Sequence, residues 1–497
     1  MKMNRRHFLK FLGLSTVLLS SCNHEAVENL TRTSPNILNG IKATNLDDFI
    51  LPEGIEYKII RSWKDPINPS EYFGTNNDFT CFFENGPDSA LLWVNHETLD
   101  PKLIPSIEEQ RKSVGGSVIG LKKEAGEWSF DSHNKLNRRY DANTKFSVTG
   151  PLASKKTSIT GTLANCSGGK TPWDTVLSCE ENYQYFDEKY GWKDFNRKDY
   201  GWVVEIDPFN PDKTPVKHSA LGRFSHENAA MAQAASGQLV VYMGDDKADE
   251  HIYKFISKES NIKLGSKLLE EGALYVAKLN KKKNTGEWLE LSMSNPKLKD
   301  HFKDQADLLI NTRKAAKLLN ATPMNRPEDL ELSPFDSSVF VALTKNPDRG
   351  VDHGSILRIT EKDHSDLKFS FDNFIVGGEE SGLSCPDNLC FDDKANLWVC
   401  TDISGDQLGK KPYKYHGNNS LFVIPTQGKD AGKAVRVASA PLGAELTGPS
   451  FSDDYKTLFL SIQHPGEDGK GSWNSKDGVP RSAVVAIKLT GYLLNES

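Results

Sequence analysis

Short β-type segments separated by turn residues limit most strongly what this chain can fold into. From about Leu51 onward, runs rich in Val, Ile, Leu and aromatic residues alternate with clusters of Gly, Pro, Asn and Asp. Many short strands with turns between them are typical of a sandwich, a barrel or a propeller. The clearest predicted strands are 90–95, 201–207, 238–246, 273–279, 338–344, 354–360, 396–402, 420–425, 457–463 and 482–489.

Polar strand ends favour a propeller among these all-β folds. Two of the runs close on acidic residues, one at Asp245 and Asp246 and one at Asp402. Such ends are expected where the loops of a propeller converge on a central site. The chain shows no strict sequence repeat, so this prediction depends on strand rhythm alone. The best candidate helix is 301–320, where apolar and Ala positions have helical spacing and Asn320 lies near the end.

Length and composition allow either several domains or one large closed β structure. The 497 residues exceed an ordinary core of ~100–200 residues. Only 37% of them are hydrophobic, but the 9% that are aromatic argue against disorder. With 61 basic and 67 acidic residues, the net charge is −6. Without a basic stripe, we expect no nucleic-acid partner.

The N-terminus has the pattern of an export signal. A charged start precedes the apolar stretch 8–19, as in signal peptides. Arg5 and Arg6 resemble the twin-arginine signal, and the run ending at Cys22 resembles a lipobox. The alternative is an ordinary secretory signal with a chance Arg pair and a chance Cys. The first reading predicts an exported lipoprotein of the bacterial envelope, anchored to the membrane by lipid on Cys22.

Export and tethering have consequences for the rest of the chain. The twin-arginine machinery carries proteins that have already folded, so it implies a cofactor loaded before export. We expect residues 1–21 to be the signal peptide, 22–50 a lipidated tether without periodicity, and 51–497 the folded part.

The remaining six cysteines form no CxxC pair and no zinc-finger spacing. In an envelope compartment they could form disulfides. The alternative is that Cys385, Cys390 and Cys400 are small buried side chains around strands. Cys179 stands apart because Glu180 follows it directly.

Dense clusters of carboxylate, amide and His residues occur in several loops. Carboxylates and amides at strand ends are hard ligands that suit Ca²⁺. A thiolate beside carboxylates, as at Cys179 and Glu180, suits a transition metal such as iron. The planar fork of an arginine such as Arg326 suits phosphate. The clusters are 95–97, 165–182, 222–230, 244–250, 324–331, 385–389, 443–448 and 462–467.

Each cluster taken alone also has an ordinary structural explanation. The NHE at 95–97 can be a solvated or capping pair, and the GDD and PDN sequences are typical turns. RPED at 326–329 can begin a helix, with Pro at the first position and acids near the dipole. The GGK at 168–170 lacks the P-loop frame, and the chain has no GxSxG or HExxH motif.

Taken together and in this order, the clusters resemble the PhoX-type alkaline phosphatases. The resemblance runs through NHE, NCSGGKTPW, SCEEN, GRFSHENAA, YMGDD, RPED, PDNL, GAELTGPSFS and IQHPGE, and covers most of 90–490. It implies a phosphomonoesterase in a single domain, 51–497. The implied fold is an irregular six-bladed β-propeller with long loops and a few inserted helices.

The resemblance also implies a site. A mixed centre of Ca²⁺ and Fe³⁺ would lie at the propeller axis. The implied metal ligands are Cys179, Glu180, Glu227, Glu328, Asp387 and Glu445, and the implied phosphate-binding residues are Arg326, Asn165 and Lys170. The substrates would be small phosphate esters, and we expect a monomer.

Two features depart from the family pattern. Ala444 stands where some members carry Cys, and Lys247 stands where an Arg is expected nearby. Two alternatives to the phosphatase function stay open. One is another calcium-dependent propeller hydrolase, acting on a lactone or a phosphotriester. The other is a non-catalytic surface lipoprotein that binds a ligand.

Overall fold

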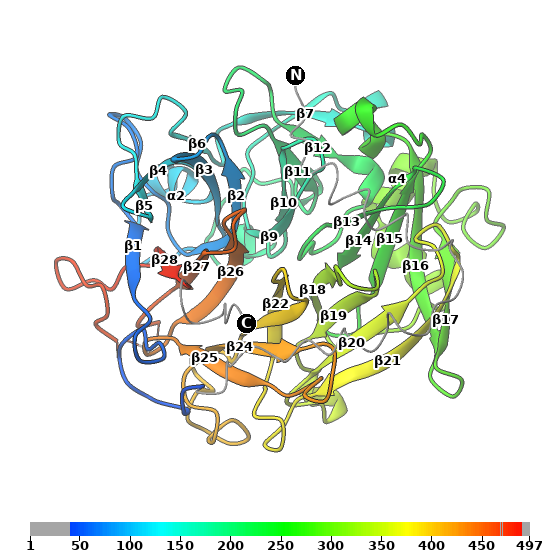
Figure 1. Ribbon diagram of the computed structural model, residues 1–497. Coiled ribbons are helices and arrows are strands. Elements are labelled where there is room, and N and C mark those ends of the chain that lie inside the picture. Colours follow the sequence, from blue (N-terminus) through cyan, green and yellow to red (C-terminus); the bar gives the residue numbers. More distant parts are fainter. Residues whose placement is uncertain (1–39, 468, 470, 490–497) are drawn as a thin grey trace.

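Antiparallel sheets arranged around a central axis make up the structure, a computed structural model that describes residues 40–467, 469 and 471–489 (Figure 1). The sheets form six blades, and each blade extends from an inner strand to the rim of the ring. The predicted signal peptide and Cys22 lie outside the described residues.

The first two blades each form one sheet. Blade 1 contains β2 (Asn77–Glu84), β3 (Ser89–His96), β4 (Gly115–Glu124) and β5 (Glu127–Phe130), with β6 (Arg138–Tyr140) paired to β4. Blade 2 contains, from the axis outward, β9 (Asn165–Lys170), β10 (Val176–Glu180), β11 (Val203–Ile206), β12 (Val216–His218), β7 (Lys145–Thr149) and β8 (Ser158–Thr160). The β12–β7 pair is parallel, so blade 2 takes in an earlier segment at its outer edge.

The next two blades share one nine-stranded sheet. Blade 3 contains β13 (Ala230–Gln233), β14 (Leu239–Gly244), β15 (Ile252–Ser257), β16 (Gly272–Asn280) and β17 (Thr285–Glu290). Blade 4 contains β18 (Pro327–Leu332), β19 (Val339–Leu343), β20 (Ser355–Thr360) and β21 (Lys368–Val376). The outer strands β17 and β21 pair antiparallel and join the two blades at the rim.

Blades 5 and 6 complete the ring. Blade 5 contains β22 (Pro386–Phe391), β23 (Asn396–Thr401), β24 (Ser420–Pro425) and β25 (Val435–Ser439). Blade 6 contains β26 (Glu445–Phe451), β27 (Thr457–Gln463), β28 (Ala483–Lys488) and β1 (Tyr57–Ser62). Because β1 pairs with β28, strands from the two ends of the described chain lie in one blade.

The inner strands contact one another around the axis in the order β2, β9, β13, β18, β22, β26 and back to β2. The prediction of an all-β, six-bladed propeller is therefore confirmed. The predicted strands are also found: 420–425 is β24, 457–463 is β27, and each of the others overlaps one strand.

Short helices lie in the connections between strands. They are α2 (Ile107–Ser113), α3 (Tyr185–Glu188), α4 (Gln305–Ile310) and α5 (Thr312–Leu318), with 3-10 turns at Pro151–Ser154, Arg197–Asp199, Ser219–Leu221, Ile262–Leu269 and Pro347–Arg349. The predicted helix 301–320 is two helices, because the chain leaves helical geometry at Asn311. The Asn311 side chain bonds Asp307 O at 2.8 Å and so ends α4. Within the described part of the chain, none of the helices is long and apolar enough to cross a membrane.

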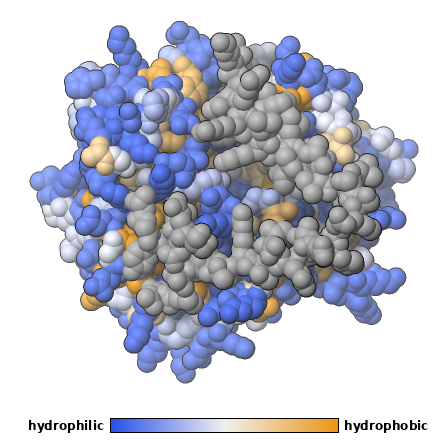
Figure 2. Space-filling model, viewed as in Figure 1, coloured by the Kyte–Doolittle hydropathy of each residue, from blue (hydrophilic) through white to orange (hydrophobic). Residues whose placement is uncertain are grey.

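The apolar cores lie between neighbouring blades. Between blades 2 and 3, Leu177 and Val203 pack with Leu239 and Val241. Between blades 6 and 1, Phe82 stacks on Phe459 with ring centroids 5.4 Å apart. The face in Figure 2 is largely hydrophilic outside the grey atoms, and its hydrophobic residues form small separate patches. The low hydrophobic content is thus compatible with several inter-blade cores.

Three expectations about local structure change. The tether predicted over 22–50 is too long, because Ile41 N donates to Arg436 O and Ile50 pairs with Ser439 on blade 5. RPED does not begin a helix, since Pro327–Leu332 is β18. The six described cysteines are all free, so the disulfide alternative is wrong among them.

Candidate metal centre

Two positions in each blade bring chemically active side chains to one end of the axis. Antiparallel pairing places the start of the inner strand beside the end of the second strand. At or just before the inner-strand starts lie Asp78, Cys166, Glu227, Glu328, Asp387 and Glu445. One or two residues after the second strands lie Glu97, Glu181, Asp246, Lys345, Asp402 and His464.

Irregular register at the inner strands lets two successive residues point in different directions and contact different neighbours. The pairing shifts between Pro327 and Leu330 in blade 4, and at the matching place in blades 1 and 5. A bulge of this kind interrupts the simple alternation of a strand. Glu328 meets ligands from neighbouring blades, whereas Asp329 Oδ2 accepts from Leu389 N of the next blade at 2.8 Å.

The same connection recurs around the ring. Asn228, which follows Glu227, bonds the main chain of Leu330 at 2.7 and 3.2 Å. Asn388, which follows Asp387, accepts from Gly448 N at 2.8 Å. The residue after each of these candidate ligands thus ties its blade to the next one and fixes the spacing between ligands.

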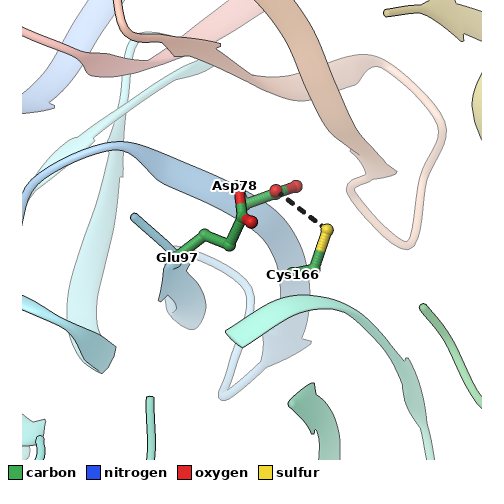
Figure 3. Close-up of side chains that lie close together, drawn as sticks. All are labelled: Asp78, Glu97 and Cys166. Atoms are coloured by element: carbon green, nitrogen blue, oxygen red, sulfur yellow. Dashed lines mark hydrogen bonds between the residues drawn. The ribbon is translucent and has the colours of Figure 1, made fainter. Parts of the chain in front are cut away.

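Three groups of side chains can each hold a metal ion. The groups are Asp78, Glu97 and Cys166; Cys166, Glu181 and Glu227; and Glu227, Glu328 and Asp387. The ligand atoms of each group lie within 4.8 Å of one another. Figure 3 shows the first group, with Cys166 directed toward Asp78. Because Cys166 and Glu227 each belong to two groups, the three sites form one continuous cluster.

Cys166 provides the thiol of this cluster. Its Sγ lies 3.3 Å from Asp78 Oδ2 and 3.5 Å from Glu227 Oε1. Burial, and then the charges of Asp78 and Glu227, raise the pKa of the Cys166 thiol. A cation would lower it and would make a thiolate ligand available.

The buried carboxylates of the cluster outnumber the cationic side chains that contact them. Burial, followed by the charges of Glu328 and Asp387, raises the pKa of Glu227 well above its usual value. Burial also raises the pKa of Asp78 to about 8. Among the described residues, no hydrogen-bond donor reaches Glu227 Oε2 or Glu181 Oε1. Buried acids without partners are costly, so this donor set fits bound metal ions.

Arg326 is the arginine beside the cluster. It forks onto Asp246 with Nε–Oδ1 and Nη2–Oδ2 distances of 2.8 and 2.7 Å. Its Nη2 also lies 2.9 Å from Glu328 Oε1, and its Nη1 lies 3.8 Å from Asp402 Oδ2. The side chain keeps 25% of its exposure, so a ligand can reach it.

Asp245, the residue before Asp246 and directly after β14, forms an ion pair with Arg313 of α5. Asp245 Oδ2 accepts from Arg313 Nε at 2.8 Å, and Asp245 Oδ1 accepts from Arg313 Nη2. Two successive aspartates therefore bind two arginines. Arg313 lies in α5, and Arg326 directly precedes β18. This arrangement fixes the backbone that carries Asp246.

Glu445 and His464 complete the ring in blade 6. His464 Nε2 lies 3.5 Å from Glu445 Oε1, and the Gly443 carbonyl accepts a hydrogen bond from His464 Nδ1 at 2.9 Å. Burial acts to lower the pKa of His464, but Glu445 outweighs it and raises that pKa to about 10. Glu445 is thus close to a positively charged imidazole and outside the three ligand groups.

The structure does not bring every predicted ligand to the axis. Cys179 packs in the apolar core with Leu177 and Val203, and the thiol among the carboxylates is Cys166. Glu180 faces away from the cluster. It accepts from Lys217 Nζ at 2.6 Å and from Gly201 N and Trp202 N at 3.0 and 3.1 Å. Its acceptors are occupied, and the neighbouring Glu181 lies in the cluster instead.

Two predicted phosphate-binding residues also lie elsewhere. Asn165 donates to Thr162 Oγ1 and Ser178 Oγ at 2.9 and 2.8 Å in a buried polar network. Lys170 is at the opposite end of β9, where its Nζ donates to Phe82 O at 3.0 Å. The predicted residues that the structure does gather are Arg326, Glu227, Glu328, Asp387 and, at the edge, Glu445.

Sequence reasoning gave no ligand role to Asp78, Cys166 or Lys345, and it named Asp402 only as an acidic strand end. Asp78 and Cys166 are each the second residue of an inner strand, as are Glu328 and Asp387. Lys345 and Asp402 each follow a second strand. Position within the strand, rather than the local motif, is the signal that could have found them.

The fold and the ligand cluster together are those of a β-propeller protein with a candidate metal centre at its axis. The chain matches the family model described as "Alkaline phosphatase PhoX" over residues 38–466, and it belongs to this family. It is 32% identical to Pseudomonas fluorescens PhoX, solved in complex with vanadate, a transition-state analogue. The TM-score is 0.83, over 90% of this chain and 97% of that one.

Weaker likenesses add nothing to this assignment. A gluconolactonase from Xanthomonas campestris, XC5397, shows 11% identity and a TM-score of 0.40 over 90% of this chain and 98% of that one. No curated relative matches.

The family match makes the chain a metal-dependent alkaline phosphatase of an exported family, which hydrolyses phosphoric monoesters. The lactonase, phosphotriesterase and ligand-binding alternatives are not favoured.

Proposed function

We propose that this phosphomonoesterase works with a mixed cluster of Fe³⁺ and Ca²⁺ at the propeller axis. The observation that carries the proposal is the overlap of three ligand groups through Cys166 and Glu227. A shared thiolate and a shared carboxylate are suited to hold several ions close together.

The chemistry of the donors supports a division between the two metals. The two groups that contain Cys166 combine a soft thiolate with carboxylates, which favours iron. The group of Glu227, Glu328 and Asp387 offers oxygen alone, which favours calcium. When bound, such cations supply positive charge that stabilises the phosphoryl oxygens during transfer.

Arg326 is the proposed phosphate-binding residue. Its fork with Asp246 orients the guanidinium, and Nη1 is left 3.8 Å from the nearest Asp402 oxygen. That edge can donate to a phosphate oxygen without first breaking a short ion pair. Substrates would be small phosphate esters that reach the partly exposed Arg326.

The proposed setting is the bacterial envelope. Arg5, Arg6 and Cys22 support export by the twin-arginine machinery followed by lipid anchoring, and we propose a monomer. Labelling with a radioactive fatty acid tests the anchor. We expect label on the wild type and none on Cys22→Ala. If Cys22→Ala were released from the membrane no more than the wild type, that result would count against the lipid anchor.

The decisive test of the metal assignment combines elemental analysis with an assay. Protein exported by its own signal should contain iron and calcium and should hydrolyse p-nitrophenyl phosphate. EGTA should abolish the activity, and added Ca²⁺ should restore it. Active protein without iron would refute the iron assignment, and activity that is insensitive to EGTA would refute the calcium assignment.

A further inference from the structure

Two blades depart from the carboxylate pattern after the second strand: blade 6 carries His464, which pairs with Glu445, and blade 4 carries Lys345. Blades 1, 2, 3 and 5 place the carboxylates Glu97, Glu181, Asp246 and Asp402 after their second strands. Blade 4 places Lys345 there, two residues after β19 ends at Leu343. A lysine in this position points to a ligand of opposite charge to the metals.

Lys345 makes its hydrogen bonds with neutral acceptors, and the charged group that faces it is the Asp402 carboxylate. Burial acts to raise the pKa of Asp402, but Lys345 and Arg326 outweigh it and lower that pKa. Lys345 Nζ donates to Ser404 Oγ at 3.1 Å and to the main-chain oxygen of Asp402 at 3.4 Å, both neutral acceptors. Among the described residues, no carboxylate oxygen lies within 4.0 Å of this ammonium. Arg326, by contrast, contacts the carboxylates of both Asp246 and Glu328.

Lys345 and Arg326 share a neighbour. Asp402 offers its main-chain oxygen to Lys345 and has its carboxylate 3.8 Å from Arg326 Nη1. The two cations therefore flank one residue at the same end of the axis. An ammonium has three N–H donors, and Lys345 uses two of them on Ser404 and Asp402, so one is left.

We propose that Lys345 is a second phosphate-binding cation, whose remaining donor contacts an oxygen of the phosphoryl group bound beside Arg326. The inference rests on the proposed role of Arg326. It adds a residue that local motifs do not reveal, and it assigns the ligand as a phosphate dianion. No bond is made or broken by Lys345; it binds and orients.

A purely structural role would be to hold the turn at Ser404. Lys345→Gln keeps a donor for that turn but removes the charge, and Lys345→Arg keeps both. Lys345→Met removes both. The matched control is Lys247→Met, which removes an exposed lysine that directly follows Asp246 in blade 3.

The experiment measures the inhibition constant of inorganic phosphate and kcat/KM on two esters. One ester is p-nitrophenyl phosphate, and the other is a sugar bisphosphate with a second anionic group. We expect Lys345→Met and Lys345→Gln to raise the phosphate constant and lower kcat/KM on both esters by roughly ten- to a hundredfold. For Lys345→Arg, both the phosphate constant and kcat/KM should stay within a few-fold of the wild-type values. For Lys247→Met, both should equal the wild-type values. Metal content and Tm are measured on every variant.

Three results would overturn the proposal. Lys345→Met could match the wild type, or only the bisphosphate could be affected, which would place Lys345 at the leaving group. Alternatively, Tm or metal content could fall while the phosphate constant of Lys345→Gln stays unchanged. Failure of the proposed function can be told apart from failure of this inference. In that case the wild type itself would not bind phosphate, and Arg326→Lys would not change its activity.

Discussion

Glu180 and Glu181 are adjacent in the sequence and equally buried, yet they belong to two different regions. Glu180 points into blade 2, where Lys217 and two backbone N–H groups satisfy its oxygens. Glu181 points to the axis, where Glu97 and Asp246 surround it and its Oε1 has no donor among the described residues. Burial raises the pKa of both carboxyl groups.

The difference teaches which buried acids are available to metals. A buried carboxylate that the protein itself satisfies contributes to folding. One that the protein leaves unsatisfied needs a partner from outside. In the described part of the chain, unsatisfied oxygens mark Glu181 and Glu227, but they also occur at Glu250 and Asp329, so they identify a candidate ligand only together with its place at the axis. The predictions below test this rule at axis positions and at satisfied positions.

The largest effect is expected from Glu227→Gln. Glu227 belongs to two ligand groups, so a neutral amide there weakens two sites at once. We expect kcat/KM for p-nitrophenyl phosphate to fall by roughly a hundredfold to a thousandfold. Elemental analysis should show fewer ions per chain. Wild-type activity with a full metal complement would break the comparison.

The second prediction compares two cysteines. Cys166→Ala removes the thiol shared by two ligand groups, and we expect loss of iron and about a hundredfold loss of activity. Cys179→Ala removes one buried sulfur from the core between blades 2 and 3. It should retain iron and activity and lose about 1 kcal/mol of stability. The opposite outcome would favour the ligand set implied by the family resemblance alone.

The fold was largely predictable from the sequence because strand rhythm is local. Runs such as 420–425 have β-type side chains and turn residues at both ends, and they became strands with nearly the same bounds. The break at Asn311 was not predictable from periodicity. It depends on Asn311, whose φ of −110° and ψ of 37° lie outside helical geometry and whose side chain bonds Asp307 O.

The site was only partly predictable, because orientation depends on register. SCEEN contains Cys179, Glu180 and Glu181, and the sequence does not say which of them faces the axis. The strand end decides it: Cys179 and Glu180 are within β10, and Glu181 is the first residue after it. Arg326, Glu227, Glu328 and Asp387 came from the family pattern, whereas Cys166 needed the blade register.

The third prediction concerns the satisfied region. Lys217→Met leaves Glu180 buried without its ion-pair partner, in a place where both side chains are almost fully covered. Breaking such a pair costs about 3–5 kcal/mol, so Tm should fall clearly. Iron and calcium per folded chain should not change. Loss of metal from the folded variant would show that the two regions are not independent.

The smallest effect concerns the acid stability that Glu205 provides. Glu205 lies in blade 2, and its Oε2 accepts from His218 Nε2 at 2.8 Å. Burial acts to raise the pKa of Glu205, but bonds from His218, Ser266 and Trp173 outweigh it and hold that pKa at about 2, against an ordinary 4.5. A lowered pKa contributes stability that is present above pH 4.5 and is lost as pH falls toward 2.

Glu205→Gln tests this linkage. At pH 7 the variant should be less stable by at most about 3 kcal/mol, and the difference from the wild type should shrink between pH 4.5 and 2. Urea unfolding at several pH values measures it. The metal ligands are the same in both proteins, so their own acid sensitivity cancels in the difference. A difference that stays constant through this range would mean that the Glu205 charge is not stabilised by its hydrogen bonds, and the rule for satisfied carboxylates would then fail at this position.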